Sequence, residues 1–220
     1  GGADDTSVRR VFHVKRLPSA DRARKDLRLL GIDPSTLDME GLSAWAESLQ
    51  RRAASANLVG PREMERLWPR HVLESLAYSL LLDRRLPVVD VGSGSGLPGI
   101  PLALLGYDVV LLEPRRKRYL FLTHATEVLG IPARAERARL EDWVADAPGR
   151  CQFVCRAVRP PRGMLELLEG YAGPGGSITM RLPPGEAIQG AAKASELVVP
   201  PLDRRGLLVQ FRLPEASRRT

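Results

Sequence analysis

Apolar side chains recur every three or four positions along the first third of the chain, which is the period of an amphipathic helix. Three segments show this period: 19–30, 38–54 and 61–82. Ser19 stands where an N-cap would begin the first helix, and Gly31 where it would end. Pro69 should kink or restart the third, because proline lacks a backbone N–H. These patterns predict a helical extension over residues 1–82.

From residue 83 onward, short apolar runs alternate with helical stretches. The runs that predict strands are 86–91, 108–113, 133–136, 151–158, 176–182, 194–202 and 205–213. Strand–helix alternation is typical of a parallel sheet covered by helices, whereas the last two runs, close in sequence, favour an antiparallel hairpin. We therefore expect an α/β, Rossmann-like core over residues 83–220, with about seven mostly parallel strands, packed as one unit with the extension.

Composition narrows the class of protein. The 220 residues are 44% hydrophobic and 27% charged, which is ordinary for a soluble domain. No apolar run reaches the roughly 18 residues of a membrane span, and the first residues lack a signal-peptide pattern. Cys151 and Cys155 would lie roughly 13 Å apart on a strand, too far for a disulfide. The three histidines show no ligand spacing. We expect a reduced, cytoplasmic protein without a structural metal.

The charge balance is basic, with 33 Lys and Arg against 26 Asp and Glu and a net charge of +7. Such a balance fits a polyanionic partner, most simply RNA or DNA. An arginine-rich proteome would produce the same excess on a purely solvated surface, so charge alone leaves both interpretations open.

A glycine-rich loop follows the first predicted strand, and two cofactor patterns compete for it. Gly94, Gly96 and Gly99 fit the dinucleotide fingerprint G-x-G-x-x-G. Gly92, Gly94 and Gly96, with Asp90 two residues earlier, resemble the first motif of class I S-adenosylmethionine methyltransferases.

The chemistry of the two ligands separates these patterns. A dinucleotide needs free N–H groups at the helix start for its pyrophosphate, and Pro98 removes one of them. S-adenosylmethionine has no phosphate, and Asp90 suits its ammonium group. Glu113, after the second strand, can accept both ribose hydroxyls in either case. We favour the methyl donor. The plainer alternatives are that Asp90 satisfies loop N–H groups and that Glu113 caps the next helix.

Four stretches together carry a more specific resemblance: "LWPRHVLESL", "DVGSGSGLPGIPLAL", "LLEPRRKRYLFL" and "CRAV". From about residue 57 to 181, the chain resembles the bacterial small-subunit rRNA guanine-N7 methyltransferase family called RsmG or GidB. The resemblance implies a class I methyltransferase fold that transfers a methyl group from S-adenosylmethionine to N7 of a single guanosine in 16S rRNA. The implied partner is the small ribosomal subunit, and we expect a monomer.

The resemblance also implies roles for individual residues. Donor-binding positions would be Asp90, Gly92, Gly94, Gly96, Leu97, Glu113, Leu140, Glu141 and Arg156, with Leu140 and Glu141 meeting the adenine. Catalytic positions facing the same cleft would be Arg156, His71 and Asn57. Arg139 and Arg181 would contact RNA. The chain departs from the family pattern at several places. "LQRRAAS" stands where the family usually shows "KWN", Arg181-Leu182 where it shows Lys-Gly, and Cys155 where serine is common, and the usual "PRxxGxPxKxPL" tail is not clear.

Guanine N7 carries a free lone pair at neutral pH, so its methylation needs positioning rather than a general base. The chain accordingly shows no paired catalytic carboxylates and no histidine triad. Arg156 would orient the guanine O6, a phosphate or the donor carboxylate. Cys155 could attack a cytosine ring as a thiolate, but a buried apolar cysteine fits its context better. A small-molecule methyltransferase and a non-catalytic rRNA-binding factor stay open as alternatives.

Overall fold

The computed structural model describes residues 17–56, 58–144, 150–156, 160–169, 176–182, 189–197 and 206–213. Its centre is a seven-stranded sheet of order β3-β2-β1-β4-β5-β7-β6. The strands are β1 Val88–Val91, β2 Val109–Leu112, β3 Ala133–Glu136, β4 Gln152–Cys155, β5 Ser177–Leu182, β6 Lys193–Leu197 and β7 Gly206–Arg212. The first five pair in parallel, whereas β7 pairs antiparallel with both β5 and β6. The α/β fold and the C-terminal hairpin are confirmed.

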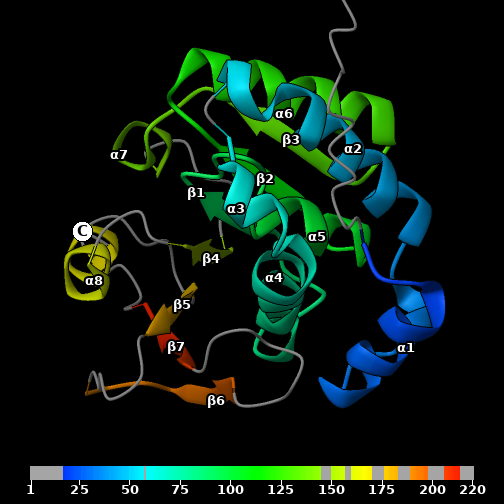
Figure 1. The fold of residues 1–220 in the computed structure, drawn as a ribbon. Helices are drawn as coiled ribbons and strands as arrows, with labels where there is room; N and C mark the ends of the chain where they lie inside the picture. Colours follow the sequence, from blue (N-terminus) through cyan, green and yellow to red (C-terminus); the bar gives the residue numbers. More distant parts are fainter. Residues whose placement is uncertain are drawn as a thin grey trace, which may run out of the picture.

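Helices cover both faces of this sheet (Figure 1). Those of the core are α5 Gly99–Leu104, α6 Arg116–Leu129, α7 Leu140–Trp143 and α8 Pro161–Glu169. Successive strand residues alternate between two apolar clusters, as the pleat requires. Val88 of β1 packs in the cluster of α5 and α6, while Val89 packs in that of α7 and α8.

The first two N-terminal segments form single helices, as predicted, whereas the third is divided into several short elements. The first two helices are α1 Ala20–Leu29, where Ser19 Oγ accepts from the N–H of Arg22, and α2 Met39–Ala56, with a 3-10 turn η1 Pro34–Thr36 between them. The third segment is interrupted, as Pro69 predicted, into α3 Pro61–Met64, a π-helical η2 Leu67–Val72, α4 Leu73–Ala77 and a 3-10 turn η3 Tyr78–Leu80. Pro69 lies inside the widened η2.

The N-terminal helices share their hydrophobic core with the sheet. One cluster contains Trp45 of α2, Leu73 of α4, Val109 of β2 and Leu122 of α6, each almost fully buried. The backbone N–H of Asp38, just before α2, also donates to the carbonyl of Leu104 in α5. The predicted boundary between residues 82 and 83 therefore crosses continuous packing, and a division into domains there stays a prediction.

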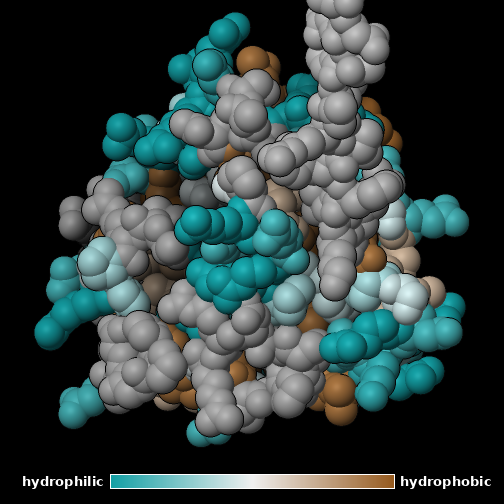
Figure 2. Space-filling model, in the orientation of Figure 1, coloured by the Kyte–Doolittle hydropathy of each residue, from teal (hydrophilic) through white to brown (hydrophobic). Residues whose placement is uncertain are grey.

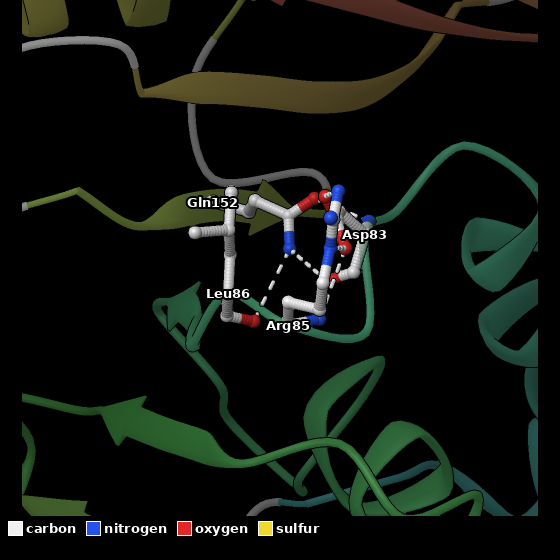
Figure 3. A network of polar contacts seen from close by, with 4 residues as sticks. All are labelled: Asp83, Arg85, Leu86 and Gln152. Atoms are coloured by element: carbon white, nitrogen blue, oxygen red, sulfur yellow. Dashed lines mark hydrogen bonds and ion pairs between the residues drawn. The ribbon is translucent and has the colours of Figure 1, made fainter.

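At the amino-terminal edge of the sheet, the buried side chain of Gln152 is hydrogen-bonded to the loop that precedes β1 (Figure 3). The side chain of Gln152 accepts from the backbone N–H of Asp83 and donates to the carbonyls of Asp83 and Leu86. The Asp83 carboxylate in turn accepts from Arg85. A cavity of about 380 Å³ opens beside this network. Within the described ranges, no helix is long and apolar enough to cross a bilayer.

Candidate active site

The parallel strands bring three of the predicted site residues to one edge of the sheet. The registers place Val91 level with the last residues of β2 and β4, so Gly92, Glu113 and Arg156 follow three neighbouring strands at the same height. β1 lies between β2 and β4, which is where the strand order reverses. Open α/β sheets bind ligands at this switch point, outside the carboxyl ends of the strands.

The loop after β1 needs glycine for its backbone and for its packing. Gly92, Gly94 and Gly96 have φ angles of 70°, 58° and 93°, in the left-handed region that disfavours other residues. A Cβ on Gly96 would also meet the side chain of Ile100, whereas the nearest atom to a Cβ on Gly94 would be 3.8 Å away. Glycine is therefore required at position 96 by both its backbone angle and the nearby Ile100, and at position 94 by the backbone angle alone.

The start of α5 offers no N–H to a pyrophosphate. The N–H of Gly99 donates to Asp90 Oδ2 at 2.9 Å, and that of Ile100 donates to the carbonyl of Gly96 at 2.7 Å. Pro98 and Pro101 carry no N–H. A dinucleotide bound by its pyrophosphate would need these donors, so the geometry disfavours the dinucleotide alternative.

Asp90 combines a structural contact with an available acceptor. Its side chain is fully buried; Oδ2 accepts from Gly99, while Oδ1 has no hydrogen-bond partner. Burial raises the pKa of Asp90 to about 7, while the Gly99 N–H, the neighbouring Ser93 hydroxyl and the Arg156 charge oppose this rise. A buried acceptor atom without a donor is costly, and the ammonium of an amino-acid group would satisfy it. The contact with a loop N–H that the sequence suggested for Asp90 is thus observed, and its role toward an ammonium group stays a prediction.

Glu113 joins the glycine loop to the next helix. Its Oε2 accepts from the N–H of Gly94 at 3.0 Å and its Oε1 from the N–H of Arg115, the residue before α6, at 2.8 Å. The side chain is 3% exposed. Each carboxylate oxygen can accept a second hydrogen bond. The carboxylate therefore holds the residue before α6, without capping the helix itself, and can still accept from a diol.

Arg156 and His71, 85 positions apart in sequence, are in direct contact. Arg156 Nη1 lies 2.9 Å from His71 Nδ1. His71 Nε2 lies 2.8 Å from Glu63 Oε2, which also accepts from Arg70 Nε at 2.8 Å. The widened turn η2 brings Arg70 and His71 toward the end of β4. A continuous polar chain thus runs from Arg156 through His71 and Glu63 to Arg70.

His71 is neutral at physiological pH. Burial and the nearby Arg156 and Arg70 charges lower the pKa of His71 to about 4, although Glu63 acts in the opposite direction. A neutral imidazole can accept a hydrogen bond on one nitrogen and donate from the other. This suits a positioning group rather than a proton carrier near pH 7.

The cysteine alternative does not fit this site. Cys151 and Cys155 are free, buried thiols, and burial raises the pKa of Cys155 to about 12. Nucleophilic attack needs the thiolate, so a covalent mechanism through Cys155 is disfavoured. Among the described residues, no group of His, Cys, Asp and Glu could hold a metal ion.

Comparison with known protein families shows to which family the chain belongs. The family described as GidB, rRNA small subunit methyltransferase G, matches residues 38–197. The chain belongs to this family. The match includes the second and third helical segments and strands β1 to β6, so it extends beyond the motifs that first indicated the resemblance.

Curated members of the rRNA small subunit methyltransferase G family align over part of their length. The protein of that name from Mycolicibacterium paratuberculosis is 39% identical over 163 residues, covering 67% of this chain and 66% of the relative. The one from Streptomyces coelicolor is 42% identical over 119 residues, covering 53% and 50%. The alignments thus span less than two thirds of these relatives. A solved structure titled "Crystal Structure of MtNAS in complex with MTA and tNA" is 16% identical, with a TM-score of 0.53 over 88% of this chain and 81% of that chain, which supports the fold alone.

The remaining predicted site residues lie at the start of α7, just before it, and at the end of the glycine loop. Leu140, buried in the α7 and α8 cluster, begins α7 with the half-buried Glu141. Arg139 is exposed as the residue before α7. Leu97 is buried beside the loop. Asn57 lies outside the described residues, so its predicted role stays a prediction.

Arg181 lies at the end of β5 in an ion pair that the sequence did not indicate. Its Nε is 3.0 Å from Glu74 Oε2 of α4, and the two side chains are only 11% and 8% exposed. The pair links the helical extension to the sheet. RNA contact by Arg181 stays a prediction, and this geometry gives the residue a structural role in addition.

Two acidic partners of predicted site residues, Glu63 and Glu74, were missed by sequence reasoning. Glu63 precedes His71 by eight positions, about two helical turns, so a search for acids on the same helical face could have found it. The Glu74–Arg181 pair joins segments more than 100 residues apart, and no local pattern reports such a contact.

Proposed function

We propose that this chain transfers a methyl group from S-adenosylmethionine to N7 of a guanosine in the 16S rRNA of the small ribosomal subunit, leaving S-adenosylhomocysteine. One observation carries the donor assignment. At the switch point of the sheet, a buried carboxylate oxygen of Asp90 lacks a donor, while the N–H groups at the start of α5 are already used. This arrangement favours a ligand with an ammonium group over one with a pyrophosphate.

The residues present fit the donor. Asp90 would accept from its ammonium group, Glu113 from its ribose hydroxyls, and the loop of Gly92, Gly94 and Gly96 would lie against it without side chains in the way. Bound there, S-adenosylmethionine supplies an activated methyl group. Leu140 and Glu141 would lie by the adenine, as the family resemblance implies.

The acceptor side requires orientation rather than proton transfer, because N7 attacks through its own lone pair. Arg156, at the end of β4, would hold the guanine O6, a phosphate or the donor carboxylate. His71 is neutral and accepts from Arg156, so it adds no second positive charge beside a purine that becomes cationic. Asn57 would complete the cleft.

The RNA assignment rests on family membership and is consistent with the surface. In Figure 2, hydrophilic side chains gather over α3 and the turn that follows it. Arg62, a residue of α3, is exposed. Beside the donor loop, Arg115, Arg116 and Lys117 are exposed at the start of α6. Together with the net charge of +7, these cations favour a phosphate-rich partner. Arg139 and Arg181 would add RNA contacts. We propose a cytoplasmic monomer.

A tritium-transfer assay tests the proposal. The protein is incubated with labelled S-adenosylmethionine and, in parallel, small ribosomal subunits lacking the modification, free total RNA, or no RNA. Label in small-subunit RNA supports the proposal. Tight donor binding by calorimetry without label in any RNA would indicate another acceptor, such as a small molecule, and absence of donor binding would favour the non-catalytic alternative.

A further inference from the structure

Glu63 occupies a position that neither the resemblance nor the donor site accounts for. It sits in α3 with a side chain 36% exposed, yet its Oε2 makes two short contacts, at 2.8 Å to His71 Nε2 and at 2.8 Å to Arg70 Nε. The first of these leads directly to Arg156, through the 2.9 Å contact between His71 Nδ1 and Arg156 Nη1.

The chemistry of the three groups fixes where the protons lie. Arginine has only donors, so His71 Nδ1 must be the acceptor in its contact with Arg156. The single proton of the neutral ring is then on Nε2, where it donates to Glu63 Oε2. Arg156 and Glu63 favour the same tautomer from the two sides of the ring, and Glu63 anchors the ring with Nδ1 directed at the Arg156 guanidinium.

We propose that Glu63 is a positioning residue for Arg156 and acts through His71. This inference rests on the proposed function only for its catalytic consequence. Glu63 touches neither donor nor acceptor; it keeps the lone pair of His71 Nδ1 directed at Arg156, and Arg156 is thereby held at the carboxyl end of β4. Arg70 shares the Glu63 oxygen and keeps the carboxylate in place.

The charges around His71 explain why the carboxylate is needed. The groups that act on the ring are Arg156 at the end of β4, and Glu63 and Arg70 from α3 and η2. With Glu63 removed, the charged groups that act on the ring would both be cations, Arg156 and Arg70, and the Nε2–H would lose its acceptor. The ring would then be free to turn, and Nδ1 would no longer be held toward Arg156. The guanidinium would lose the acceptor that keeps it in position.

Histidine nitrogen NMR tests the hydrogen bonds of His71 directly and does not depend on activity. The chain has three histidines, and His71→Asn assigns the signal of interest. At pH 7 we expect the Nε2–H form, with a slowly exchanging Nε2 proton, in the wild type and in Glu63→Gln, whose amide oxygen can still accept. Glu63→Ala should speed exchange of the Nε2 proton and shift the Nδ1 signal toward that of a nitrogen that accepts no hydrogen bond. Glu65→Ala, which removes an exposed acid two residues away, is the matched control and should change nothing. Wild-type Nδ1 shift and proton exchange in Glu63→Ala would overturn the proposal.

Kinetics then test the route to Arg156. Glu63→Ala should lower kcat for methyl transfer about tenfold, Glu63→Gln should restore most of it, and melting temperatures should identify any loss of fold. In a His71→Ala background, Glu63→Ala should cost nothing further, because the connection is already broken. A full additional loss in that background would contradict action through His71. If the wild type transfers no methyl group, the proposed function fails, while the NMR result still decides the role of Glu63 toward His71.

Discussion

Asp90 and Glu113 each combine a structural hydrogen bond with capacity to accept from a ligand. Both were expected from their places at strand ends, and both now hold loop N–H groups as well as offering acceptors to a ligand. The sequence could predict the residue types because a carboxylate after each strand is a local pattern. It could not predict that Asp90 Oδ1 stays without a partner, since that depends on the packing of Gly99 against the carboxylate.

Donor affinity should depend on the ionisation of Asp90. Because its pKa is raised to about 7, the carboxylate is mostly ionised at pH 8 and mostly protonated at pH 6, and only the ionised form pairs with an ammonium. We expect the Kd for S-adenosylmethionine to rise about tenfold from pH 8 to pH 6. Calorimetry checks this, with Asp90→Asn as the control that retains only the titration of the donor amine. Equal pH profiles for the two proteins would exclude a direct pairing.

Two glycines of the loop should differ in their tolerance of a methyl group. Gly96→Ala faces both a φ of +93° and a collision with Ile100, whereas Gly94→Ala faces only the φ of +58°. We expect Gly94→Ala to lose about 1 kcal/mol of unfolding free energy and Gly96→Ala to lose more, together with donor binding. Chemical denaturation and calorimetry on both variants measure the difference, and an equal loss in the two would show that the Ile100 contact relaxes freely.

At the scale of elements, the helices and strands follow from the apolar period, whereas their pairing does not. The strand run 194–202 predicted a strand near β6, but nothing local indicates that β7 inserts between β5 and β6. Pro69 correctly predicted an interruption of the third helix. It did not indicate that the widened turn η2 would carry His71 to the end of β4. Contacts between distant elements depend on the fold as a whole, and periodicity reports only local order.

The Arg181–Glu74 pair should contribute strongly to the docking of α4 on β5. Arg181→Ala breaks a buried ion pair on the Glu74 side chain, and breaking such pairs costs about 3–5 kcal/mol of unfolding free energy. The double variant Arg181→Met with Glu74→Leu should recover most of that stability, since it buries no charge. Urea denaturation distinguishes the two proteins. If Arg181→Ala were as stable as the wild type, the pair would have no structural role. Methyl transfer to RNA by the double variant, which keeps the fold but lacks the Arg181 charge, tests separately whether Arg181 contacts RNA.

At the scale of the whole molecule, the helical extension and the sheet share one core, and the donor edge lies opposite the edge fastened by Gln152. The sequence favoured a single packed unit but could not show it, because the pattern of each segment is complete by itself. The shared cluster of Trp45, Leu73 and Val109 supplies the physical connection.

The extension and the core should therefore unfold together. Trp45 and Trp68 report on the N-terminal helices, and Trp143 on α7. Fluorescence of a variant with only the first two tryptophans and of one with only the third should give coincident denaturation midpoints, as a two-state transition requires. The tryptophans not needed are replaced by phenylalanine. Separate midpoints would establish two domains with a boundary near residue 82.

The most direct test of the account is the chemical identity of the product. Small ribosomal subunits lacking the modification are incubated with the protein and S-adenosylmethionine, and their 16S rRNA is digested to nucleosides for mass spectrometry. We predict N7-methylguanosine at about one per RNA molecule, and almost none with Arg156→Ala. Methylation of another atom or base, or an unaffected yield with Arg156→Ala, would contradict the assignment of the reaction and of its site.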